Sequence, residues 1–173
     1  MRMQKMVLVV TFWISTVASS MAQDTSAAHY FKKAEYYFAN ADYEYAIEYY
    51  NKTLQLDQNH VNSYLQRGFC KNLLGKHQDA INDFSQAIIL SPDNGWAYVS
   101  RGSAKNKVEQ YESAITDFNK ALEINPSDQE AFNNRGFSKK QLGDLAGACA
   151  DWKTSKKLGN KEAPIILKNN YCK

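Results

Sequence analysis

Residues 61–94 read VNSYLQRGFCKNLLGKHQDAINDFSQAIILSPDN, and residues 95–128 read GWAYVSRGSAKNKVEQYESAITDFNKALEINPSD. Both stretches have tyrosine at the fourth place, glycine at the eighth, alanine at the twentieth and phenylalanine at the twenty-fourth. Related residues recur at the same places in residues 27–60 and 129–162, so one pattern repeats every 34 residues. A fixed period of this length indicates a stacked array of helical hairpins.

The repeated residues predict how each hairpin packs. Residues four apart lie on one face of a helix, so the fourth and eighth places form one stripe and the twentieth and twenty-fourth another. Small residues let the two helices approach closely, and the aromatic rings fill the space beside the contact. The residues concerned are Tyr30, Ala34, Ala46 and Tyr50; Tyr64, Gly68, Ala80 and Phe84; Tyr98, Gly102, Ala114 and Phe118; and Phe132, Gly136, Ala148 and Trp152. Turns are expected at 41–42, 75–76, 109–110 and 143–144.

This pattern closely resembles the tetratricopeptide repeat (TPR), which also has proline at place 32, as at Pro92 and Pro126. Two places depart from the family. Place 32 is Gln58 in the first unit and Asn160 in the fourth, and place 11, usually aromatic, is Tyr37 in the first unit but Lys71, Lys105 and Lys139 afterwards. The resemblance implies an all-α fold, a right-handed superhelical α-solenoid of four hairpins whose first helices line a concave groove. Residues 163–171 are expected to form a capping helix, with Ile165, Ile166 and Tyr171 facing the array and Lys168 facing outward.

The N-terminus has the pattern of a secretory signal peptide. Arg2 and Lys5 precede an apolar run, and small residues follow up to Ala22. The run is shorter than the roughly 20 apolar residues that span a bilayer. We therefore expect residues 1–22 to be removed and residues 23–173 to form one TPR domain that is secreted or periplasmic. An uncleaved N-terminal anchor is the alternative.

Charge and motifs exclude several kinds of function. The formal net charge is +3, and loss of Arg2 and Lys5 would leave about +1, too little to attract nucleic acid or to hold the mature chain on a membrane. The three histidines occupy unrelated places in the repeat, and no catalytic or phosphate-binding motif occurs. We therefore expect no enzymatic activity, no metal site and no cofactor.

The three cysteines allow one pairing that antiparallel packing favours. Cys149 lies near the start of the last long helix, and Cys172 follows the capping segment at a similar distance from the turn between them. In an exported protein these two are expected to form a disulfide. Cys70 occupies a place where small side chains pack, so we expect it to be a buried thiol.

A polar pair also repeats, at places 7 and 23. Arginine at the first and aspartate at the second recur in three units, but the first unit has Lys33 and Tyr49 there. Joint absence of both partners favours an ion pair within or between hairpins over a ladder of arginines for an acidic ligand. The repeated pairs are Arg67 and Asp83, Arg101 and Asp117, and Arg135 and Asp151.

The TPR resemblance also implies which places line the groove, namely 2, 5, 9, 12 and 13. Aromatic and aliphatic side chains alternate there with asparagines, a mixture that suits a peptide. The family's carboxylate clamp needs lysine and asparagine where Phe31 and Glu35 stand, so a chaperone C-terminus is not the expected ligand. The predicted peptide-binding residues are Phe31, Leu65, Phe69, Asn72, Trp96, Val99, Asn106, Asn133 and Phe137.

These observations predict an exported adaptor that binds a peptide or helix of a partner protein. A structural, self-assembling module is the alternative, because tyrosines concentrate at the open N-terminal end of the array, and this would make the protein a homo-oligomer. The residues concerned are Tyr30, Tyr36, Tyr37, Tyr43, Tyr45, Tyr49 and Tyr50.

Overall fold

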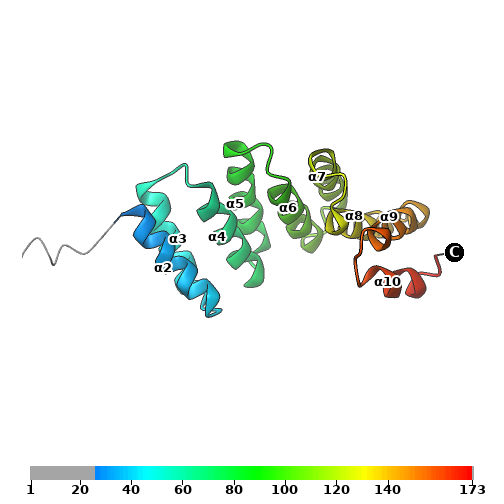
Figure 1. Cartoon of the computed structure of the whole chain (residues 1–173), viewed down its shortest axis with the longest axis horizontal. Coiled ribbons are helices and arrows are strands. Elements are labelled where there is room, and N and C mark those ends of the chain that lie inside the picture. The colour runs from blue at the N-terminus through cyan, green and yellow to red at the C-terminus, as the bar shows by residue number, and fades with distance from the viewer. Residues whose placement is uncertain (1–25, 173) are drawn as a thin grey trace, which may run out of the picture.

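The computed structural model describes residues 26–172, in which nine α-helices and no strand occur (Figure 1). Consecutive helices pack as antiparallel pairs, and each pair packs on the next to form an extended row (Figure 1). This confirms the predicted all-α solenoid, whereas the expected signal peptide lies outside the described residues. The helices are α2 (Ala27–Ala39), α3 (Tyr43–Leu56), α4 (Val61–Leu73), α5 (His77–Leu90), α6 (Gly95–Lys107), α7 (Tyr111–Ile124), α8 (Gln129–Gln141), α9 (Leu145–Lys157) and α10 (Ala163–Asn169).

The first helix of every pair begins at a side-chain cap, and the caps are 34 residues apart. Ser26, His60, Asn94 and Asp128 each accept a hydrogen bond from a backbone N–H in the first turn of α2, α4, α6 and α8. Such a cap satisfies one of the backbone donors that a helix start leaves free. The repeat therefore encodes where each hairpin begins as well as how it packs.

The turn inside each hairpin also repeats, through one residue in the left-handed backbone region. The φ angles are 61° at Ala41, 75° at Gly75, 61° at Glu109 and 86° at Gly143. Glycine adopts this conformation without steric cost, so the second and fourth turns have the residue that the geometry favours. All four turns lie where the sequence predicts them.

The close approach of paired helices depends on the small residue at place 8. A Cβ atom built on Gly102 would lie 2.8 Å from two ring carbons of Phe118, and one on Gly136 would lie 2.6 Å from Nε1 of Trp152. The alanines at place 20 and the aromatic rings at place 24 are buried in all four units. The predicted packing of the hairpins is therefore confirmed.

The C-terminal segment forms α10, but its outward face differs from the prediction. Ala163 is fully buried and Ile166 is partly buried, whereas Ile165 is 64% exposed and Tyr171 is 90% exposed. The expectation that Ile165 and Tyr171 face the array is wrong. Because α10 is only seven residues long, its side of contact is set by Ala163 and by the tether at Cys172 rather than by an apolar stripe.

Within residues 26–172, none of the helices combines the length and the apolar character that crossing a bilayer requires.

Candidate functional site

The repeated arginines and aspartates form ion clusters inside the hairpins. In the third unit, Nε and Nη2 of Arg101 donate to the two carboxylate oxygens of Asp117 at 2.9 and 2.7 Å. Lys105 from place 11 adds its ammonium 2.8 Å from Oδ2 of the same carboxylate. The predicted structural role of the pairs is confirmed. The same arrangement occurs for Arg67, Lys71 and Asp83 and for Arg135, Lys139 and Asp151.

Each arginine also joins neighbouring hairpins. Nη1 of Arg101 donates to Ser85 on the preceding hairpin, and the guanidinium lies 5.6 Å from the ring centre of Tyr98. The matching arginines of the second and fourth units donate to Asn51 and Asn119. The departure from the family at place 11 thus belongs to one polar network, which ties each second helix to two first-helix side chains.

The first unit replaces this network with stacked rings. Tyr37 and Tyr49 occupy places 11 and 23, and their rings lie parallel with centroids 5.3 Å apart. Lys33 at place 7 lies 4.6 Å from the Tyr49 ring centre, within the range of a cation–π contact. Most of the N-terminal tyrosines therefore pack on one another, while Tyr36 and Tyr45 are exposed. Self-association through those two residues stays a prediction.

A row of aromatic rings runs across the face formed by α2, α4, α6 and α8, which we call the first-helix face. Phe38 contacts Phe69, with centroids 5.8 Å apart, and Phe69 contacts Trp96 at 6.3 Å. Trp96 is 44% exposed, and Phe137 further along this face is 42% exposed. Phe31 is partly buried against Tyr50 and His60. The structure thus brings Phe69 and Trp96 together and leaves Phe137 available.

Two predicted contact residues are buried instead. Leu65 is 6% exposed in the core around α5, and Val99 is 5% exposed in the core around α7. Their place in the repeat lies under the neighbouring first helix, because successive hairpins pack closely. Leu65 and Val99 therefore pack in the core beneath the first-helix face and cannot contact a peptide.

The predicted asparagines are engaged with neighbouring side chains to different degrees. Asn72 Oδ1 lies 2.7 Å from Nδ1 of His77. Asn106 accepts from the Ser138 hydroxyl at 2.7 Å and donates to the backbone oxygen of Asn134 at 3.4 Å. By contrast, Oδ1 of Asn133 is buried and has no hydrogen-bond partner among the described residues. A buried acceptor without a donor costs about 1–3 kcal/mol.

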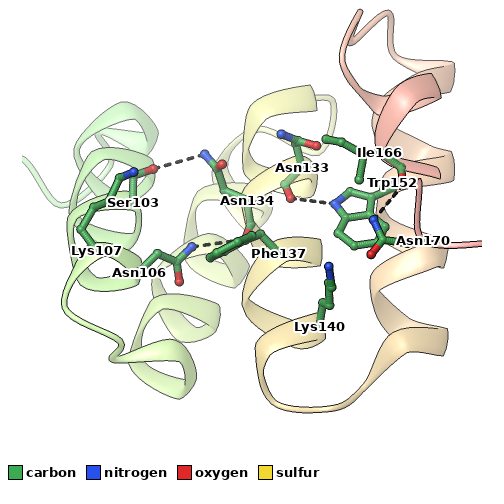
Figure 2. Close-up of a pocket in the computed structure, with 10 residues that line it drawn as sticks. All are labelled: Ser103, Asn106, Lys107, Asn133, Asn134, Phe137, Lys140, Trp152, Ile166 and Asn170. Atoms are coloured by element: carbon green, nitrogen blue, oxygen red, sulfur yellow. Dashed lines mark hydrogen bonds between the residues drawn. The ribbon is translucent and has the colours of Figure 1, made fainter. Parts of the chain in front are cut away.

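A cavity lies between α6, α8 and α10 (Figure 2). We call it the Phe137 cavity; its volume is about 380 Å³. Of the predicted residues it contains Asn106, Asn133 and Phe137, and its far wall is the indole of Trp152, whose Nε1 donates to the backbone oxygen of Asn133 at 3.1 Å. The lining residues are Ser103, Asn106, Lys107, Asn133, Asn134, Phe137, Lys140, Trp152, Ile166 and Asn170.

Four lining residues fall outside the peptide-binding places of the repeat. Asn134 occupies place 6, Trp152 occupies place 24 in α9, Ile166 belongs to α10, and Asn170 is the C-cap of that helix. Asn134 Nδ2 donates to Ser103 at 3.2 Å and so joins the two first helices across the cavity floor. No signal within a single repeat could identify Ile166 and Asn170, since they lie beyond the last repeat.

A disulfide holds α10 beside the cavity. The structure joins Cys149 of α9 to Cys172, with Cα atoms 5.6 Å apart. Cys70 is the remaining thiol; it is buried as predicted, and desolvation raises its pKa to about 12. A thiol in that state is a core side chain and not a nucleophile. Among the described residues, no three His, Cys, Asp or Glu side chains gather as a metal site requires.

Comparison with known proteins finds the same repeat. A family model described as TPR repeat matches residues 106–143, and one described as anaphase-promoting complex, cyclosome, subunit 3 matches residues 10–87. No curated protein matches the chain significantly.

Solved structures share the fold over most of the chain. The crystal structure of MamA superposes with a TM-score of 0.79 at 22% identity, covering 86% of this chain and 82% of that one. The first TPR of Spaghetti (RPAP3), bound to the HSP90 peptide SRMEEVD, superposes with a TM-score of 0.66 at 27% identity, covering 71% and 98%. The Arabidopsis OM64 TPR domain gives 0.65 at 22% identity, covering 67% and 96%. The 34-residue period, the four packed hairpins and the match to the TPR repeat model together show that this chain has the tetratricopeptide repeat fold.

Proposed function

We propose that this protein is an extracytoplasmic adaptor that binds an extended segment or a helix of a partner protein along the first-helix face. The TPR fold is that of protein–protein interaction scaffolds, which are typically not enzymes. The observation that carries the proposal is the Phe137 cavity, which lies on the same face as the exposed ring of Trp96.

The chemistry of this face suits a peptide. Trp96 and Phe137 offer apolar area that no side chain of the described residues covers fully. Asn106, Asn133 and Asn134 line the cavity, and their amide groups are of the kind that bonds to a peptide backbone. The RPAP3 repeat with its bound HSP90 peptide supports this proposal by analogy. The present chain has Phe31 and Glu35 where the family's carboxylate clamp needs lysine and asparagine.

Replacing Phe69, Trp96 and Phe137 with alanine is expected to abolish peptide binding without unfolding the protein. Buried aromatic anchors contribute most of the affinity of such interfaces, about 2 kcal/mol or more each when truncated. Peptides selected from a random display library on the wild-type protein would be tested against the variant by fluorescence anisotropy.

A control variant carries Leu56→Ala and Ile89→Ala, which remove exposed apolar side chains from the second helices α3 and α5. Equal peptide affinity for the wild type, the control and the triple variant would refute the groove assignment. Circular dichroism must show the same helix content for all three.

Export is the second part of the proposal, supported by the pattern of residues 1–22 and by the disulfide, which oxidising compartments favour. Protein recovered from its native source is expected to begin at Gln23. Intact mass spectrometry measures this directly, and a recovered chain that still carries residues 1–22 would contradict cleavage.

A further inference from the structure

We propose that the Phe137 cavity binds an acidic segment of the partner, in which carboxylate side chains flank an apolar one. This inference rests on the proposed function, because it names the chemistry of the peptide that the first-helix face takes. The charges that surround the cavity carry it.

Two lysines of the cavity are unpaired, although neighbouring lysines on the same helices are paired. On α6, Lys105 pairs with Asp117, but Lys107 makes no ion pair with any described residue. On α8, Lys139 pairs with Asp151, but Lys140 makes none. The fold thus neutralises the lysines at the back of the first helices and leaves two positive charges at the cavity.

No acidic side chain lines the cavity to offset these charges. An adjoining hollow shares Asn133 and Asn134 with the cavity, and it contains Glu130 and Glu162 together with Lys161. The cavity itself therefore carries two lysines and no carboxylate among its lining residues. A bound segment is expected to place its acidic residues toward Lys107 and Lys140.

The apolar part of the cavity sits between the two charges. Phe137 lies between Lys107 and Lys140 in the view of Figure 2, and Ile166 and the Trp152 indole form the far wall. A ligand that matches this order has an apolar side chain for Phe137 and a carboxylate on either side of it. The asparagine amides between α6 and α8 are the groups that would bond to its backbone.

Two separate cations favour side-chain carboxylates over one chain terminus. Lys107 ends α6 and Lys140 lies in the last turn of α8, so the charges come from different helices. A single terminal carboxylate supplies one charge and satisfies one of them. Two acidic side chains of an internal segment satisfy both.

A purely structural explanation exists and makes a different prediction. Lysines in the last turn of a helix interact favourably with the negative end of its macrodipole. If this were their whole role, Lys107→Gln and Lys140→Gln would lower the stability and leave peptide preference unchanged. If instead the two lysines bind carboxylates of a partner, the same substitutions change the peptide preference and alter the stability only slightly.

The test uses the mature protein and two random peptide libraries, one displayed as internal inserts and one ending in a free carboxylate. Internal peptides selected on the wild type are expected to be enriched in acidic residues on both sides of an apolar residue. The double variant Lys107→Gln/Lys140→Gln is expected to bind the selected peptides about tenfold more weakly, since each screened charge contact contributes modestly. The difference should shrink at high salt.

Lys156→Gln/Lys157→Gln is the matched control. It changes the charge by the same amount in the last turn of α9, away from the cavity, and is expected to bind like the wild type.

Selected peptides without acidic enrichment, or enrichment confined to free C-termini, would overturn the inference while leaving the adaptor function intact. An unchanged preference in the Lys107→Gln/Lys140→Gln variant would also overturn it. Failure to select any peptide would overturn the proposed function itself.

Discussion

Replacing Asp117 with alanine is expected to lower the free energy of unfolding by about 3 kcal/mol. The carboxylate side chain is only 4% exposed and accepts hydrogen bonds or ion pairs from two cations, Arg101 and Lys105. Without it, both cations stay beside the second helix with no counter-charge. Arg101 would also lose the anchor from which it reaches Ser85 on the preceding hairpin. Urea unfolding followed by circular dichroism measures the change.

The control for this prediction is an ion pair on the same helix that is open to solvent. Lys120 and Glu123 of α7 lie 2.8 Å apart, but their side chains are 48% and 66% exposed. Exposed pairs of this kind contribute little, because water and salt screen them. Glu123→Gln is therefore expected to unfold at the same urea concentration as the wild type. Equal midpoints for both variants would mean that burial gives the Asp117 cluster no advantage.

The hairpin architecture could be predicted from the sequence because local and long-range signals agree. A small residue at place 8 and a ring at place 24 predict one contact, and in every unit these residues pack in the core. The arginine–aspartate pairing could be predicted for a related reason, since the first unit lacks both partners. Covariation among units of one chain supplied the information that a single repeat lacks.

The third member of the ion cluster could have been found by the same reasoning. Lysine at place 11 is four residues after the arginine, on the same helical face. It too is replaced in the first unit, where Tyr37 stacks on Tyr49. Three places therefore change together, from arginine, lysine and aspartate to lysine and two tyrosines. The lysine at place 11 departs from the family because it contacts the same carboxylate as the arginine.

The groove was predicted less well, because its exposure depends on the packing between hairpins. Leu65 and Val99 occupy a place that lines the groove in the family, yet both are buried here. The angle between successive hairpins decides how far such a residue is covered, and no single repeat encodes that angle.

The sequence does not predict the cavity wall formed by α10 for another reason. Ile165 and Ile166 are adjacent, and a helix of seven residues has too few turns to show which of them faces inward.

Breaking the Cys149–Cys172 disulfide is expected to release α10 while the four hairpins stay folded. The bond closes a loop of 23 residues, which corresponds to about 3 kcal/mol of stabilisation in the loop-entropy account. Few other contacts hold the segment, because Ala163 is its only fully buried side chain. Treatment with a dithiol is therefore expected to speed amide hydrogen exchange in α10 about 100-fold. Exchange in α4 to α7 should not change.

Release of α10 would also open the Phe137 cavity, since Ile166 and Asn170 form part of its wall. Peptides selected on the oxidised protein are expected to bind the reduced protein more weakly. The control is the double variant Cys149→Ser/Cys172→Ser, which should exchange rapidly in α10 with or without the dithiol.

Thiol titration of the unfolded wild type should find one free thiol, Cys70, before reduction and three afterwards. Three thiols before reduction, or exchange in α10 that the dithiol does not alter, would show that the bond does not hold this helix in place.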